Sequence, residues 1–233
     1  MSNDMFDGYD DAGTDSRGGV GIPDGDKIAI IKAIDMNYRG KPGGNKFDTP
    51  AVRVAYEFTE TVDGTSMSSS GDKLFFISPK KNETDGQKIN RRIALSDLKM
   101  LIFVALGKTE MSRNEFEDAL SDGELVGLPF GVRTVWTERY DKVKKCLDPT
   151  KASLEFIAYF QADATKTDDG HEVYLQADGK PLAMPYSPDK LSPKMRMKLF
   201  DPEKAKAAER GDSGGYNSGN QNDPDDFDDE IPF

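Results

Sequence analysis

The chain has 233 residues, one cysteine, one histidine and a formal net charge of −11 at pH 7. A single cysteine excludes an internal disulfide, and one cysteine with one histidine cannot build a Cys/His zinc site. No apolar run is long enough for a transmembrane helix, and the acidic N-terminus lacks the apolar stretch of a secretory signal, so we expect a cytoplasmic protein.

The negative charge is concentrated at the two ends of the chain. Residues 1–26 contain seven aspartates and one arginine, and residues 211–233 contain seven acidic and no basic residues. Residues 27–210 therefore carry a net charge of +2, and this middle region can present a cationic face although the whole chain is acidic. Residues 1–24 have little to bury, so we expect them to be disordered.

Period-two alternation of apolar residues predicts five strands within a domain at residues 25–200. The predicted strands are 27–38, 51–61, 74–78, 128–140 and 153–161. Two helices, forming an insert at about residues 96–121, are expected between the third and fourth strands. Ser96 is the expected N-cap of the first helix, which ends at Gly107, and Ser112 with Glu115 predicts a capping box at the second.

This order of elements indicates a mainly β protein with inserted helices. Five strands with a helical insert after the third favour the OB-fold, a five-stranded Greek-key barrel, and a generic five-stranded α+β sheet is the alternative. A C-terminal extension is expected to hold a hairpin that pairs residues 173–175 with 182–184, and a short helix at 195–200. Residues 201–222 predict a short charged helix, at 203–210, and a Gly/Asn/Gln linker, and residues 223–233 form an acidic tip.

The tip has the sequence DDFDDEIPF. It resembles the terminal peptide of bacterial single-stranded DNA-binding proteins, which also follows a Gly/Asn/Gln-rich spacer. In that family the tip docks on replication, recombination and repair proteins. The resemblance implies a partner-binding role for Asp228, Asp229, Glu230, Ile231, Pro232 and Phe233. A purely solubilising acidic tail is the alternative, but an exposed terminal phenylalanine would not improve solubility.

The remainder of the chain departs from the ordinary bacterial family, which is shorter and lacks a two-helix insert of this kind. Its layout looks more like the single-stranded DNA-binding proteins of tailed bacteriophages, which have enlarged OB-folds. That resemblance implies sequence-independent binding of single-stranded DNA during phage replication, recombination and repair in the host cytoplasm. It implies no small-molecule substrate, no cofactor and no membrane partner.

Binding of single strands requires cations for the phosphates and aromatic rings for the bases. Both kinds of residue are interleaved on the second and third predicted strands and on the connections after the first and fourth, the elements that form the binding surface of an OB-fold. The predicted DNA-binding residues are Tyr38, Arg39, Lys41, Lys46, Phe47, Arg53, Phe75, Phe76, Lys80, Lys81, Arg133, Trp136, Arg139, Tyr140 and Lys142.

Some of these aromatic residues are also candidates for the core. Phe75 and Phe76 are adjacent on a strand, so one should be buried and the other exposed. Trp136 shares a face with Val132, so it is equally compatible with a place in the core and with an exposed surface on which bases stack. We prefer Tyr38, Phe47 and Tyr140 as stacking residues and expect Tyr56 in the core.

The sequence does not suggest an enzyme. His171 lies in an acidic turn, Cys146 has no evident base, and no phosphate-binding glycine motif follows a strand. We therefore expect no catalytic residues and no metal site. Two alternatives to the main prediction are a recombination mediator or annealing protein, and an acidic protein-interaction adaptor that does not bind DNA.

Overall fold

The computed structural model describes residues 22–40, 46–47, 49–141, 146–167 and 169–209. Most of the expected disordered N-terminal segment, the Gly/Asn/Gln linker and the acidic tip lie outside these residues.

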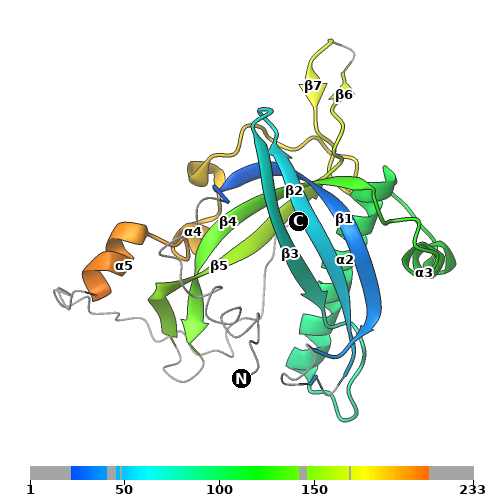
Figure 1. The fold of residues 1–233 in the computed structure, drawn as a ribbon, viewed down its shortest axis with the longest axis horizontal. Coiled ribbons are helices and arrows are strands. Elements are labelled where there is room, and N and C mark those ends of the chain that lie inside the picture. Colours follow the sequence, from blue (N-terminus) through cyan, green and yellow to red (C-terminus); the bar gives the residue numbers. More distant parts are fainter. Residues whose placement is uncertain (1–21, 41–45, 48, 142–145, 168, 210–233) are drawn as a thin grey trace, which may run out of the picture.

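The protein is mainly β, and its main element is one antiparallel sheet of five strands in the order β3-β2-β1-β4-β5 (Figure 1). The strands are β1 (Gly25–Tyr38), β2 (Ala51–Thr61), β3 (Ser66–Phe75), β4 (Pro129–Asp141) and β5 (Cys146–Phe160). The period-two alternation therefore located β1, β2 and β4 to within a few residues.

The bounds of the third and fifth predicted strands were wrong. β3 begins at Ser66 and ends at Phe75, whereas the prediction was 74–78. Its serine-rich first half has no apolar alternation, but its backbone pairs with β2 from Phe58↔Ser69 onward. β5 begins at Cys146 rather than at residue 153, because its first residues pair with the end of β4.

The sheet is strongly curled. The pairing of β1 with β2 contains three register shifts, and such irregularities bend and twist a strand. As a result Tyr56 and Phe58 of β2 meet Phe156 of β5, with ring centroids 5.2 and 6.1 Å apart. The inner faces of β2 and β5 are thus in contact although β1 and β4 separate these strands within the sheet.

Lys73 of β3 connects the two edges of the curled sheet to a helix. Its Nζ lies 4.6 Å from the ring centroid of Phe156 and 5.5 Å from that of Tyr159, both on β5. It also forms an ion pair of 2.8 Å with Asp97 of α2 (Asp85–Leu106). Burial, with the nearby Asp97 carboxylate, raises the pKa of Tyr159 well above its ordinary value.

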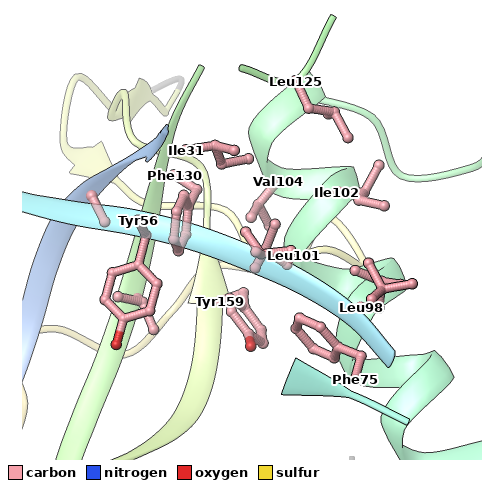
Figure 2. Packing of buried hydrophobic residues seen from close by; sticks show 14 of the residues in the cluster. Ile31, Tyr56, Phe75, Leu98, Leu101, Ile102, Val104, Leu125, Phe130 and Tyr159 are labelled. Atoms are coloured by element: carbon pink, nitrogen blue, oxygen red, sulfur yellow. The ribbon is translucent and has the colours of Figure 1, made fainter. Parts of the chain in front are cut away.

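Helix α2 covers one end of the core. Leu98, Leu101 and Ile102 are completely buried, and Figure 2 shows α2 side chains facing Phe75 and Tyr159 of the sheet. The predicted N-cap at Ser96 was wrong, because a capping box of Thr84 and Gln87 begins the helix twelve residues earlier. The first half of α2 is largely exposed and carries no apolar stripe that would have revealed it.

The second helix agrees with the prediction. α3 (Arg113–Ser121) begins with the expected capping box of Ser112 and Glu115 and buries Phe116 and Leu120. No helix among the described residues is long and apolar enough to cross a membrane.

The C-terminal extension runs back along the sheet. It contains a projecting hairpin of β6 (Thr165–Lys166) and β7 (Glu172–Val173), a 3₁₀ turn at Pro188–Lys190, α4 (Pro193–Arg196) and α5 (Pro202–Glu209) (Figure 1). The expected pairing of 173–175 with 182–184 is present only in part. The Leu182 N–H donates to the Tyr174 carbonyl at 2.7 Å, but the bridge joins Leu175 to Pro181, and Val173 pairs with Thr165 of β6.

The last part of the extension is fastened to β4. The helix expected at 195–200 ends at Arg196. A turn at residues 197–198 follows it, Leu199 then forms a bridge with Thr137, and the Phe200 N–H donates to the Trp136 carbonyl at 2.9 Å. Lys204 of α5 donates to the buried carboxylate of Glu138 at 2.8 Å. These contacts hold Phe200 and Lys204 against β4, and the described part of the chain ends shortly after them, at residue 209.

Gly131 offers a test of the packing between β4 and β5. It pairs with the completely buried Phe160, and a Cβ at residue 131 would overlap the Phe160 ring. We expect Gly131→Ala to lower the free energy of unfolding by about 1–3 kcal/mol, measured by urea denaturation.

Gly86→Ala is the matched control. Gly86 is in the first turn of α2, and a Cβ there meets no described atom within 4 Å. This substitution should raise stability by up to about 1 kcal/mol, since alanine is the better helix former. Equal stability of the two variants would contradict the packing described for Phe160.

Lys27 is a buried cation at the start of β1. Its side chain is completely buried, and Nζ donates to the Thr134 hydroxyl at 2.7 Å and to the Gly25 carbonyl at 3.1 Å. Burial lowers the pKa of Lys27 to about 8, although Asp24 and Asp26 oppose the shift.

The lowered pKa of Lys27 predicts a pH dependence of stability. The ordinary lysine value is 10.5, so between about pH 8 and 10.5 the unfolded chain binds more protons at this group than the folded protein does. The contribution of Lys27 to stability should therefore rise with pH across that range. In urea titrations at about pH 7 and pH 9.5, the stability of the wild type relative to Lys27→Met should increase at the higher pH. A constant difference would contradict the lowered pKa.

Candidate nucleic-acid interface

Three aromatic side chains gather at one end of the sheet. Tyr38 ends β1, Phe47 precedes β2 and Phe76 follows β3. The ring centroids of Tyr38 and Phe47 are 6.1 Å apart and those of Phe47 and Phe76 are 5.0 Å apart, both in edge-on geometry. We call these three residues the aromatic cluster.

Local backbone structure explains how the cluster forms. The Phe47 N–H donates to the Arg39 carbonyl at 2.9 Å, which closes the β1–β2 connection and returns Phe47 to the side of Tyr38. Phe75 points into the core, so Phe76 at the end of the strand points out and remains 41% exposed. The cluster therefore presents aromatic surface to solvent.

Cationic side chains surround the cluster. The Arg53 guanidinium lies 5.3 Å from the centroid of the Tyr38 ring, a cation–π distance. Arg39 and Lys46 are exposed beside Tyr38 and Phe47, and Lys80 and Lys81 are exposed in the loop that follows Phe76. Nine of the predicted site residues thus lie in or next to one region: Tyr38, Arg39, Lys46, Phe47, Arg53, Phe75, Phe76, Lys80 and Lys81.

The outer face of strands β1–β3 carries balanced charges. Arg53 forms an ion pair of 2.8 Å with Asp72, and Lys32 forms one of 2.9 Å with Glu57. A hydrogen bond from Arg53 to Asp72 raises the pKa of Arg53 above its ordinary value. The sequence prediction included Arg53 but missed Asp72, whose pairing depends on the β2–β3 register.

Two predicted site residues build the interior. Phe75 is 1% exposed and belongs to the core, as expected for one of two adjacent phenylalanines. Arg133 was predicted to contact phosphate, but its Nε and Nη2 bind the two carboxylate oxygens of Asp26 at 2.6 and 2.9 Å. Its Nη2 also donates to the Ala183 carbonyl at 2.9 Å, so Arg133 joins β1 and β4 to the extension.

Trp136 is held by the start of the described chain. Its indole N–H donates to the Ile22 carbonyl at 2.7 Å, and its backbone N–H donates to Asp24 at 2.8 Å. Among the described residues, no ring contact joins Trp136 to the aromatic cluster. The half-buried indole therefore acts as an anchor for residues 22–24.

The remaining predicted residues are Arg139 and Tyr140 near the end of β4, Lys142 just after that strand, and Lys41 in the connection after β1. Arg139 is exposed on β4. The side chain of Tyr140, and Lys41 and Lys142, lie outside the part of the structure that is described.

A shallow hollow of about 350 Å³ lies where β3 and β5 approach each other. Tyr56, Lys73 and Phe156 line it, together with Asp72 and Leu154. Tyr56 is 8% exposed and packs in the core, as predicted. The sequence prediction missed Lys73, because nothing in its own segment shows that the rings of β5 lie next to it.

No family model matches this sequence, and a search of curated proteins found none that matches it.

Proposed function

We propose that this protein binds single-stranded DNA without sequence specificity and recruits replication, recombination and repair proteins through its C-terminal tip. The observation that carries the proposal is the aromatic cluster, which combines a solvent-exposed ring with surrounding arginine and lysine side chains. Rings of this kind stack on unpaired bases of any sequence, and the cations contact the phosphates.

We also propose that the sheet is an OB-fold. Its pairings β1–β2, β2–β3, β1–β4 and β4–β5, with a helix between β3 and β4, agree with a five-stranded Greek-key barrel. The approach of β3 to β5 through Lys73 supports near closure of the barrel. In that fold, strands 2 and 3 and the loops after strands 1 and 4 bind oligonucleotides, and the aromatic cluster lies on the first of these loops and beside β3.

The tip supplies the second half of the proposal. Its Ile231-Pro232-Phe233 ending after an acidic run fits an apolar pocket with a basic rim on a partner protein. With the bacteriophage-like layout, this ending supports a phage protein that engages host enzymes in the host cytoplasm.

The neighbouring residues Phe75 and Phe76 provide a direct test of the proposed interface. Phe76→Ala should weaken binding to a fluorescently labelled oligo-dT by about 1–3 kcal/mol and leave the fold intact, because the ring is exposed. Phe75→Ala should instead lower the free energy of unfolding by about 3–5 kcal/mol, because that ring is buried. The measurements are fluorescence anisotropy and urea denaturation. Wild-type affinity in folded Phe76→Ala would remove the cluster from the binding surface.

Deletion of Phe233 tests the recruiting role. The shortened chain should bind oligo-dT at least as tightly as the full chain, since the proposed DNA surface is on the sheet. In pull-downs from bacterial lysate it should lose the replication and repair proteins that the full chain retains. Recovery of the same proteins by both chains would contradict the role of the tip.

A further inference from the structure

Arg53 contacts the aromatic cluster through Tyr38, and its positive charge is paired with the carboxylate of Asp72. It lies on the outer face of β2, opposite Leu74 of β3. Its Nη2 is 2.8 Å from Asp72 Oδ1, and its guanidinium lies over Tyr38. The two side chains of the ion pair are 33% and 29% exposed, so both can be reached from solvent.

The hydrogen-bonding capacity of Arg53 is not filled. A guanidinium has five N–H donors, and its Nε edge suits an anion with two oxygens. The Nε of Arg53 is buried and has no hydrogen-bond partner among the described residues. A buried donor without an acceptor is unfavourable, so a ligand that places an oxygen against Nε would form a hydrogen bond that Asp72 does not form.

The second Arg–Asp pair of the sheet shows what a structural pair looks like in this protein. Arg133 uses both Nε and Nη2 to hold Asp26, and the two side chains are only 10% and 5% exposed. The Arg53–Asp72 pair differs on both counts, because no described residue accepts a hydrogen bond from its Nε and both side chains are partly exposed to solvent. The comparison indicates that Arg53 and Asp72 form an exchangeable pair.

We propose that Asp72 binds the Arg53 guanidinium when DNA is absent and that a DNA phosphate displaces it when a strand binds. Asp72 then limits the affinity of the site for DNA and changes the salt dependence of binding. This inference rests on the proposed function. A phosphodiester carries two non-bridging oxygens, so it can bind Nη2 and, once the Arg53 side chain leaves Asp72 and turns outward to expose Nε, that donor as well. The aromatic cluster next to Arg53 holds the adjacent base.

The substitution Asp72→Asn tests the inference, since it removes the competing charge and retains the shape of the side chain. Oligo-dT should bind about two- to fivefold tighter at low salt, measured by fluorescence anisotropy. In the wild type, Asp72 takes up a salt cation once Arg53 has moved to phosphate, and this uptake offsets the cation that the DNA releases. Asp72→Asn removes the uptake, so the slope of log K against log salt should steepen by up to about 0.7. Asp72→Ser serves as a second variant, and thermal unfolding verifies that each variant is folded.

Asp178→Asn is the matched control. It also removes one negative charge and breaks a lysine–aspartate pair of 2.7 Å with Lys180. Its turn lies beside Thr109, beyond the C-terminal end of α2, whereas the aromatic cluster adjoins the loop that precedes that helix. A charge that far away is screened at moderate salt, so affinity should be unchanged.

A double-mutant cycle with Arg53→Gln assigns the effect to Arg53. The gain from Asp72→Asn should disappear in the Arg53→Gln background. The inference is overturned if Asp72→Asn and Asp72→Ser bind no tighter than the wild type, or if the gain persists without Arg53, while the proposed function survives either result. If the wild type does not bind oligo-dT, the proposed function fails and this inference fails with it.

Discussion

The contacts of Lys73 hold together three parts of the protein that are far apart in the sequence. One ammonium group lies against rings of β5 and pairs with Asp97 of α2, while its own strand, β3, forms the opposite edge of the sheet. A cation within about 6 Å of an aromatic ring is attracted to its face, and the partly exposed Asp97 carboxylate pairs with the same ammonium group. This arrangement holds the two edges of the curled sheet together. The antiparallel pairings Tyr38↔Ala51 and Val52↔Phe75 place the ends of β1 and β3 beside the start of β2, where the aromatic cluster forms.

The ion pairs inside the sheet differ from those on its outer face in how far solvent can reach them. Inside the sheet, Arg133 donates from Nε and Nη2 to Asp26 and to a backbone carbonyl, and it links the first strand to the C-terminal extension. On the outer face, Arg53 and Lys32 are paired with carboxylates that solvent can reach. The net negative charge of the chain is therefore compatible with a cationic binding surface, because most of the excess acid lies in the terminal segments.

The sequence predicted those parts of the fold that local patterns determine. Alternation identified β1, β2 and β4, and a capping box identified α3. The start of β3 was missed because its serines show no apolar alternation, although their backbone pairs with β2. The start of α2 was missed because its first half is polar, although Thr84 and Gln87 form a readable capping box.

For the site, Tyr38 and Phe47 were predicted because they flank a loop with basic residues, and Phe76 because it follows Phe75 on a strand. The pairing of Arg133 with Asp26 could not be predicted, because it spans 107 residues and depends on the register of β1 and β4. The central claim, a preference for single strands, is tested most directly by anisotropy of the wild-type protein with labelled oligo-dT and with a duplex of equal length over a salt series. We predict tight oligo-dT binding that weakens as salt rises, and much weaker duplex binding. Equal affinity for both, or no binding of oligo-dT at low salt, would contradict the account and leave the tip as the functional part of an acidic adaptor.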